Sequence, residues 1–129
     1  MPIVLVLALA FHVLSAVFWA GSTFTLARIG GDGVARLFRP QMGTAGVAVL
    51  TGAYLWSQLH HGFGMPEKVL LVGALCAFVA AGVQGALVGP VVRVAKVGAA
   101  ASPRVLIAHR IASVLLAVTL ICMVAARRI

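Results

Sequence analysis

Acidic residues are almost absent from this sequence. Two of its 129 residues are acidic, ten are Lys or Arg, and charged residues make up 9% of the chain. Asp32 and Glu67 fall in different loops, on opposite sides of the predicted bundle, so acid–base chemistry by paired carboxylates is excluded. No serine or cysteine carries a nucleophile motif, and no glycine-rich phosphate loop is present. Hydrolysis and phosphoryl transfer are therefore disfavoured.

Cysteine is also scarce, and the basic residues form no patch. Cys76 and Cys122 lie in apolar runs without ligand spacing, which predicts free thiols that act as small apolar residues rather than a disulfide or metal site. The formal net charge of +8 comes from residues scattered at the ends of apolar runs. This distribution favours contact with anionic lipid and predicts no nucleic-acid partner.

Apolar residues are what the chain has in abundance. They make up 63% of it, and the mean hydropathy is +1.15, whereas soluble domains are about half apolar. The pattern predicts an all-α integral membrane protein with one domain and four spans, at about residues 2–27, 40–59, 66–94 and 103–126. Pro90 is expected to kink or end the third span. Short connections predict a four-helix, up-and-down antiparallel bundle in the lipid bilayer.

The loop charges predict an orientation. Basic residues gather in the loops after the first and third spans: Arg28, Arg36, Arg39, Arg93, Lys96 and Arg104. The positive-inside bias predicts that the protein spans a bacterial inner membrane with these loops on the cytoplasmic side. The His60-His61 turn and both termini would then face outward, although Arg127 and Arg128 argue mildly against this.

The segment 11–26 carries the strongest functional signal, because an ionisable residue inside a membrane span is costly and by default marks a site. His12 lies there, and Ser15, Ala16, Trp19 and Thr23 share its helical face. The opposite face, with Leu9, Leu14, Val17 and Phe18, suits lipid or bundle packing. Two interpretations of His12 stay open. It could be a haem or metal ligand in a site lined by Ser15, Trp19 and Thr23, or a core histidine hydrogen-bonded to a neighbouring helix.

His109, in the fourth span, is the second candidate ligand. A single haem bridging His12 and His109 would need tilting, because their predicted depths differ by about 8 Å. The alternative is a histidine near the membrane interface, beside Arg110.

The turn between the second and third spans offers a candidate copper site. Imidazole and thioether both suit copper, so His60, His61 and Met65 could hold it, although adjacent histidines are also common in exposed turns. Lys68, which opens the third span, could bind an anionic group such as a haem propionate. Its alternative is a snorkelling interfacial lysine, paired with Glu67.

Small residues recur at every fourth position of the third span: Gly73, Ala77, Ala81, Gly85 and Gly89. Such a stripe allows close helix approach, within the chain or in a homo-oligomer, and could also leave room for a flat cofactor. Gln84, deep in the same span, is predicted to hydrogen-bond between helices.

Three segments together resemble one superfamily. His12 to Arg28 is similar to the opening His-x6-Trp-x-Gly helix of the copper-resistance protein D (CopD) domain. Arg36-Leu37-Phe38 leading to Val49–Leu59 resembles the second helix of that domain, and Lys68-Val69-Leu70-Leu71 resembles its lysine-bearing third helix. The HemJ-type protoporphyrinogen IX oxidases, membrane proteins that bind haem b, have a similar arrangement.

This resemblance implies a haem b site with His12 and Lys68 as functional residues. The first hypothesis is accordingly a haem b protein in electron transfer or an oxidoreductase step, with a quinone, a tetrapyrrole substrate or another redox membrane protein as partner. Two alternatives stay open. One is a copper-handling protein for transport or resistance, and the other is an accessory subunit that has no cofactor.

Overall fold

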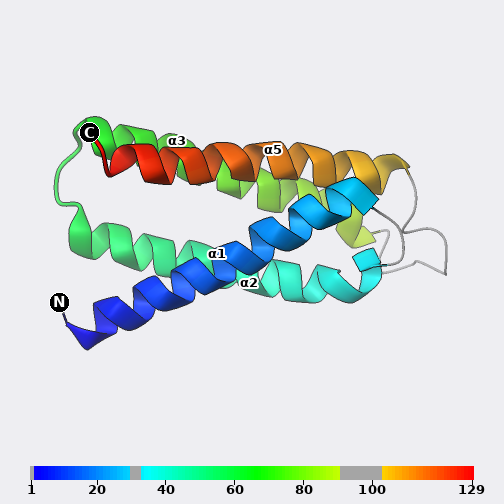
Figure 1. Cartoon of the computed structure of the whole chain (residues 1–129), viewed down its shortest axis with the longest axis horizontal. Helices are drawn as coiled ribbons and strands as arrows, with labels where there is room; N and C mark the ends of the chain where they lie inside the picture. The colour runs from blue at the N-terminus through cyan, green and yellow to red at the C-terminus, as the bar shows by residue number, and fades with distance from the viewer. Residues whose placement is uncertain (1, 30–32, 91–102) are drawn as a thin grey trace.

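The protein is an antiparallel bundle of four long helices. The computed structural model describes residues 2–29, 33–90 and 103–129. The helices are α1 (Ile3–Ile29), α2 (Gly33–Leu59), α3 (Met65–Val83) and α5 (Pro103–Ala126), and a π-helical turn, η1 (Gln84–Val88), continues α3. Successive helices run in opposite directions, and both termini lie at one end (Figure 1). The predicted all-α, up-and-down bundle is confirmed.

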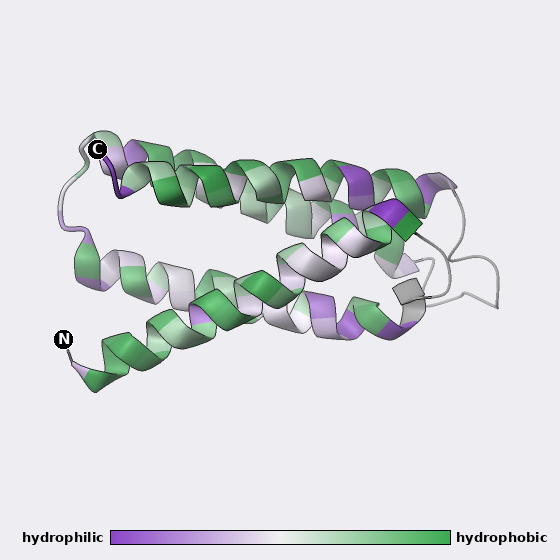
Figure 2. Ribbon diagram, viewed as in Figure 1, coloured by the Kyte–Doolittle hydropathy of each residue, from purple (hydrophilic) through white to green (hydrophobic). Residues whose placement is uncertain are grey.

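Among the residues that the structure describes, three helices are long and apolar enough to cross a membrane: Ile3–Ile29, Met65–Val88 and Pro103–Ala126. Hydrophobic residues line much of these helices, and hydrophilic ones gather near the helix ends (Figure 2). The helix α2 is as long as α1 but less apolar, because Pro40, Gln41 and several Gly and Thr residues lie within it. The chain is thus a membrane-embedded helical bundle.

The bundle core consists of two clusters at different levels. The central cluster contains small residues around one indole and one leucine: Trp19, Ala20, Ala45, Ala48, Ala77, Ala80, Ala112 and Leu116. The end cluster contains Leu26, Val88, Val105 and Ala108, with Leu37 and Phe38 packed against it. Small side chains let helix backbones approach closely, which is how membrane helices gain packing contacts without a hydrophobic driving force.

The two ends of the small-residue stripe, Gly73 and Gly89, pack within the chain. A Cβ on Gly73 would come to 3.0 Å from the Cβ of Cys122 and 3.4 Å from the carbonyl oxygen of Thr119, both on α5. The Thr119 hydroxyl also donates to the Gly73 carbonyl oxygen at 2.8 Å. At the other end of the stripe, Gly89 lies against the ring of Phe38 on α2. Homo-oligomer formation through the stripe stays a prediction.

Two helix boundaries differ from the sequence-based expectation. The second helix begins at Gly33, not at residue 40, so Pro40 lies inside it and Arg36 and Arg39 are helical. Packing of Leu37 and Phe38 in the end cluster explains this extension. Regular α-helical hydrogen bonding of the third span ends at Val83, where the π-helical turn begins ahead of Pro90. The predicted loops at Asp32 and at residues 96–102, with Arg93 and Lys96, lie outside the described residues.

The surface of the bundle is apolar where lipid was expected. Leu9, Leu14, Val17 and Phe18 are exposed, which confirms the outward face of α1. Cys76 and Cys122 are free, as predicted, and half-buried.

Candidate functional site

His12 belongs to α1, and contacts with α2 fix the orientation of its imidazole. Its Nδ1 lies 2.9 Å from the carbonyl oxygen of Ala48 and 3.2 Å from the hydroxyl oxygen of Thr51. A carbonyl oxygen only accepts, so Nδ1 carries the proton and donates it. In the neutral ring this is the Nδ1–H tautomer, whose Nε2 has a free lone pair. None of the described residues forms a hydrogen bond with Nε2.

Glycine at position 52 makes room for this imidazole. A Cβ on Gly52 would come to 3.0 Å from Cε1 and 3.4 Å from Nδ1 of His12. Alanine cannot be placed there unless the ring moves. The ring is thus held by a hydrogen bond on one side and by the backbone of α2 on another, while the side chain stays partly exposed.

An open, apolar hollow lies one helical turn from His12. Its volume is about 360 Å³, and it is lined by Val4, Leu7, Ala8, Leu50, Thr51 and Tyr54. Ala8 precedes His12 by one turn on α1, and Thr51 contacts the imidazole Nδ1. The histidine and the hollow therefore belong to the same α1–α2 groove.

Trp19 and Thr23 belong to a buried hydrogen-bond network. The indole Nε1–H of Trp19 donates to Gln84 Oε1 at 2.7 Å, and Gln84 Nε2 donates to the Thr23 hydroxyl oxygen at 3.0 Å. Gln41 Nε2 donates to the same oxygen at 3.2 Å. The predicted interhelical role of Gln84 is confirmed. The hydroxyl of Ser15 donates locally, to the Phe11 carbonyl oxygen at 2.7 Å.

His109 is almost completely buried, with 1% of its surface exposed. Its Nδ1 donates to the Val105 carbonyl oxygen at 3.0 Å, and its Nε2 has no hydrogen-bond partner among the described residues. The adjacent Arg110 is exposed, and its Nε donates to the Ala27 carbonyl oxygen at 3.3 Å, which joins α5 to the end of α1.

His12 and His109 lie at different levels of the bundle. His12 contacts α2 at Ala48 to Gly52, whereas His109 follows Ala108 of the end cluster, near the level of Thr23. Eleven residues separate His12 from Thr23, or about 16 Å along the helix. The structure does not bring the two imidazoles together.

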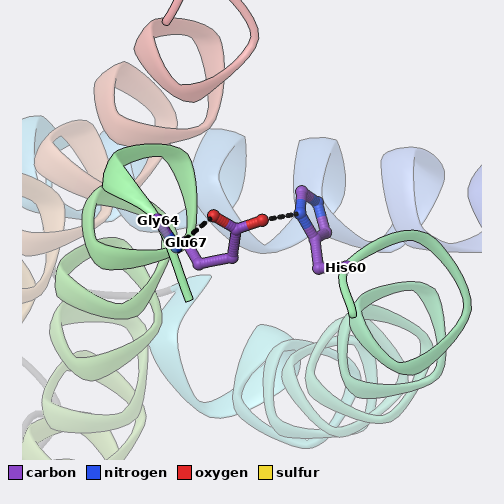
Figure 3. A network of polar contacts seen from close by, with 3 residues as sticks. All are labelled: His60, Gly64 and Glu67. Atoms are coloured by element: carbon purple, nitrogen blue, oxygen red, sulfur yellow. Dashed lines mark hydrogen bonds and ion pairs between the residues drawn. The ribbon is translucent and has the colours of Figure 1, made fainter. Parts of the chain in front are cut away.

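The turn between α2 and α3 holds one histidine and leaves the other exposed. His60 Nδ1 donates to Glu67 Oε1 at 3.0 Å, and Glu67 Oε2 accepts from the Gly64 N–H at 3.0 Å (Figure 3). One carboxylate thus caps α3 and ties it to the end of α2. His61, Met65 and Lys68 are exposed. Glu67 pairs with His60, not with Lys68 as considered from the sequence.

No group of three or more His, Cys, Asp or Glu that could hold a metal ion occurs in the part of the chain that the structure describes. Three residues of α2 orient His12 and were not named as site residues from the sequence: Ala48, Thr51 and Gly52. Thr51 and Gly52 do fall in the segment Val49–Leu59 that carries the resemblance. Gln41 was missed as well.

Comparison of the chain with protein families, with curated proteins and with solved structures gives no match.

Proposed function

We propose that this membrane-embedded bundle binds haem b through Nε2 of His12 and serves a redox or electron-transfer role. The observation that carries the proposal is the hydrogen bond from His12 Nδ1 to the Ala48 carbonyl oxygen. Histidines that ligate metals almost always donate their other ring N–H to a carbonyl or carboxylate, which fixes the tautomer and raises the basicity of the ligating nitrogen.

The apolar surroundings of His12 support the proposal. The adjacent hollow presents aliphatic side chains with one tyrosine, and Gly52 keeps the imidazole close to α2. When bound, haem iron supplies one-electron chemistry. The chain would ligate it through His12, orient the imidazole through Ala48 and Thr51, and contact it with the apolar side chains of the hollow.

Lys68 stays a proposed residue of the haem site. His109 follows Ala108 of the end cluster, away from the level of His12, so no second ligand is assigned. The redox partner, whether a quinone, a tetrapyrrole or another membrane protein, belongs to the same proposal.

An absorption spectrum tests the proposal. Wild type, His12→Ala and His61→Ala are expressed with haem supplied and purified in detergent. The absorption spectrum of each is recorded in the oxidised state and again after reduction with dithionite. His61 is the matched control, because it is an exposed histidine in the turn. We expect a Soret band and sharp reduced α and β bands in wild type and in His61→Ala, and their loss in His12→Ala.

A colourless wild-type protein would overturn the proposal. Copper titration against His60→Ala and His61→Ala then tests the copper alternative, which uses the turn rather than the α1–α2 groove. Protein that binds neither would fit an accessory subunit.

A further inference from the structure

Each of the four long helical segments contributes one buried polar side chain at the same level of the bundle. These residues, here called the polar layer, are Thr23 of α1, Gln41 of α2, Gln84 of η1 and His109 of α5, and each has at most 1% of its surface exposed. Buried polar groups in a membrane bundle are costly, so four at one level need an explanation.

The two core clusters fix this level. On each segment the polar residue separates a member of the central cluster from a residue packed in the end cluster. Ala20 and Leu26 flank Thr23, Ala45 and Phe38 flank Gln41, Ala80 and Val88 flank Gln84, and Ala112 and Ala108 flank His109. The polar layer therefore lies between the two clusters.

Hydrogen-bond directions in the layer follow from Trp19. An indole N–H only donates, so Gln84 presents its oxygen to Trp19 and its Nε2 to Thr23. The Thr23 hydroxyl hydrogen goes to the Trp19 carbonyl oxygen at 2.6 Å. Thr23 can then only accept from Gln41, so Gln41 uses its Nε2. Gln41 Oε1 is left as an acceptor.

His109 contributes a second acceptor to the layer. Its Nδ1–H donates to the Val105 carbonyl oxygen, so in the neutral ring its Nε2 carries a lone pair. Gln41 Oε1 and His109 Nε2 are the two buried side-chain atoms without a hydrogen-bond partner in the described part of the chain. A buried acceptor without a donor is costly in a membrane interior, and one molecule with two donor hydrogens could satisfy both acceptors.

The occupant that fits is neutral and small. A charged occupant is disfavoured, because the layer is enclosed and moving a charge out of water is costly. A large ligand is disfavoured because all four side chains of the layer are enclosed. Water has two O–H donors and is the smallest such molecule.

We propose that the polar layer binds a water molecule that donates one O–H to His109 Nε2 and the other to Gln41 Oε1. This water site is separate from the haem site proposed at His12, which lies about 16 Å away along α1. The water would be hydrogen-bonded to a histidine inside the bundle. This proposal does not depend on whether His12 ligates haem.

Ring-nitrogen NMR of protein with isotope-labelled histidine, in lipid nanodiscs, tests the proposal. The four histidines are assigned with single His→Gln variants. We expect His109 to be the neutral Nδ1–H tautomer, with Nε2 shifted upfield as in a hydrogen-bonded acceptor, and magnetisation transfer from water to the ring. A protonated Nε2, or a free Nε2 without transfer from water, would overturn the proposal.

Gln41→Met tests the second partner. It keeps the side-chain length and removes Oε1, and Thr23 still accepts from Gln84. We expect loss of the water transfer and a downfield shift of His109 Nε2, while Gln58→Met, at an exposed glutamine of the same helix, changes neither. Unchanged transfer in Gln41→Met would contradict the bridging position. If Gln41→Met does not fold, the wild-type measurement decides by itself.

Discussion

His12 and Ala48 define the geometry on which the proposed haem site rests. The α1 imidazole donates its Nδ1–H to an α2 carbonyl oxygen at 2.9 Å, and Gly52 lies one helical turn along α2 against the same ring. The backbone of one helix thereby orients the only imidazole in the α1–α2 groove whose Nε2 is left for a ligand, among the residues that the structure describes.

Substitution Gly52→Ala should weaken haem binding. The new Cβ would meet Cε1 of His12 at 3.0 Å, so the ring must move by a few tenths of an ångström, which disturbs its hydrogen bond to Ala48. We expect a lower haem content per protein, measured from the Soret band against total protein. The control is Gly46→Ala on the same helix, where no atom lies within 4 Å of the new Cβ. It should keep the haem content and add about 0.5–1 kcal/mol of helix stability. Equal haem content in both variants would contradict the geometry.

Substitution Trp19→Phe should destabilise the bundle. It removes the indole donor and leaves the buried Gln84 Oε1 without a partner, which costs about 1–3 kcal/mol. Unfolding in mixed micelles measures the effect. The double variant Trp19→Phe/Gln84→Met removes both partners and should recover part of the loss. If Gln84→Met adds its full cost to that of Trp19→Phe, the two side chains are not coupled.

Substitution Gly73→Ala should separate α3 from α5. Its Cβ would lie 3.0 Å from Cys122 Cβ and 3.4 Å from a backbone carbonyl oxygen, so the helices must shift, at a cost of about 1–3 kcal/mol. Gly82→Ala, on the same helix with no atom within 4 Å of the new Cβ, is the control and should be neutral or stabilising. The melting temperature should therefore fall in Gly73→Ala and should not fall in Gly82→Ala. Equal melting temperatures in the two variants would argue against close packing at Gly73.

Residue periodicity was sufficient to predict the bundle and the inward face of α1. Ser15, Trp19 and Thr23 are buried and Leu14 is exposed, because helical spacing alone sorts these side chains by face. The start of α2 could not be predicted in this way. Pro40 and the preceding arginines indicate a loop locally, and only long-range packing of Phe38 against α1, η1 and α5 favours helix.

The partners of the candidate site residues also depend on long-range contacts. His12 was predicted as a ligand or as a hydrogen-bonded core residue, and the hydrogen bond to α2 is confirmed while ligation stays a prediction. Its partner is a backbone carbonyl, which no side-chain pattern can indicate. The polar layer was missed for a similar reason, because Gln41, Gln84 and His109 align only once the register of four helices is set.

Imidazole rescue of His12→Gly tests the central claim most directly. This substitution deletes the ligand and leaves space of its size beside Gly52. Purified His12→Gly is supplied with haem, and its absorption spectrum is recorded before and after addition of free imidazole, with wild type alongside. The account predicts no haem bands in the variant alone and their return with imidazole. Haem bands in His12→Gly that match wild type without imidazole would contradict ligation by His12.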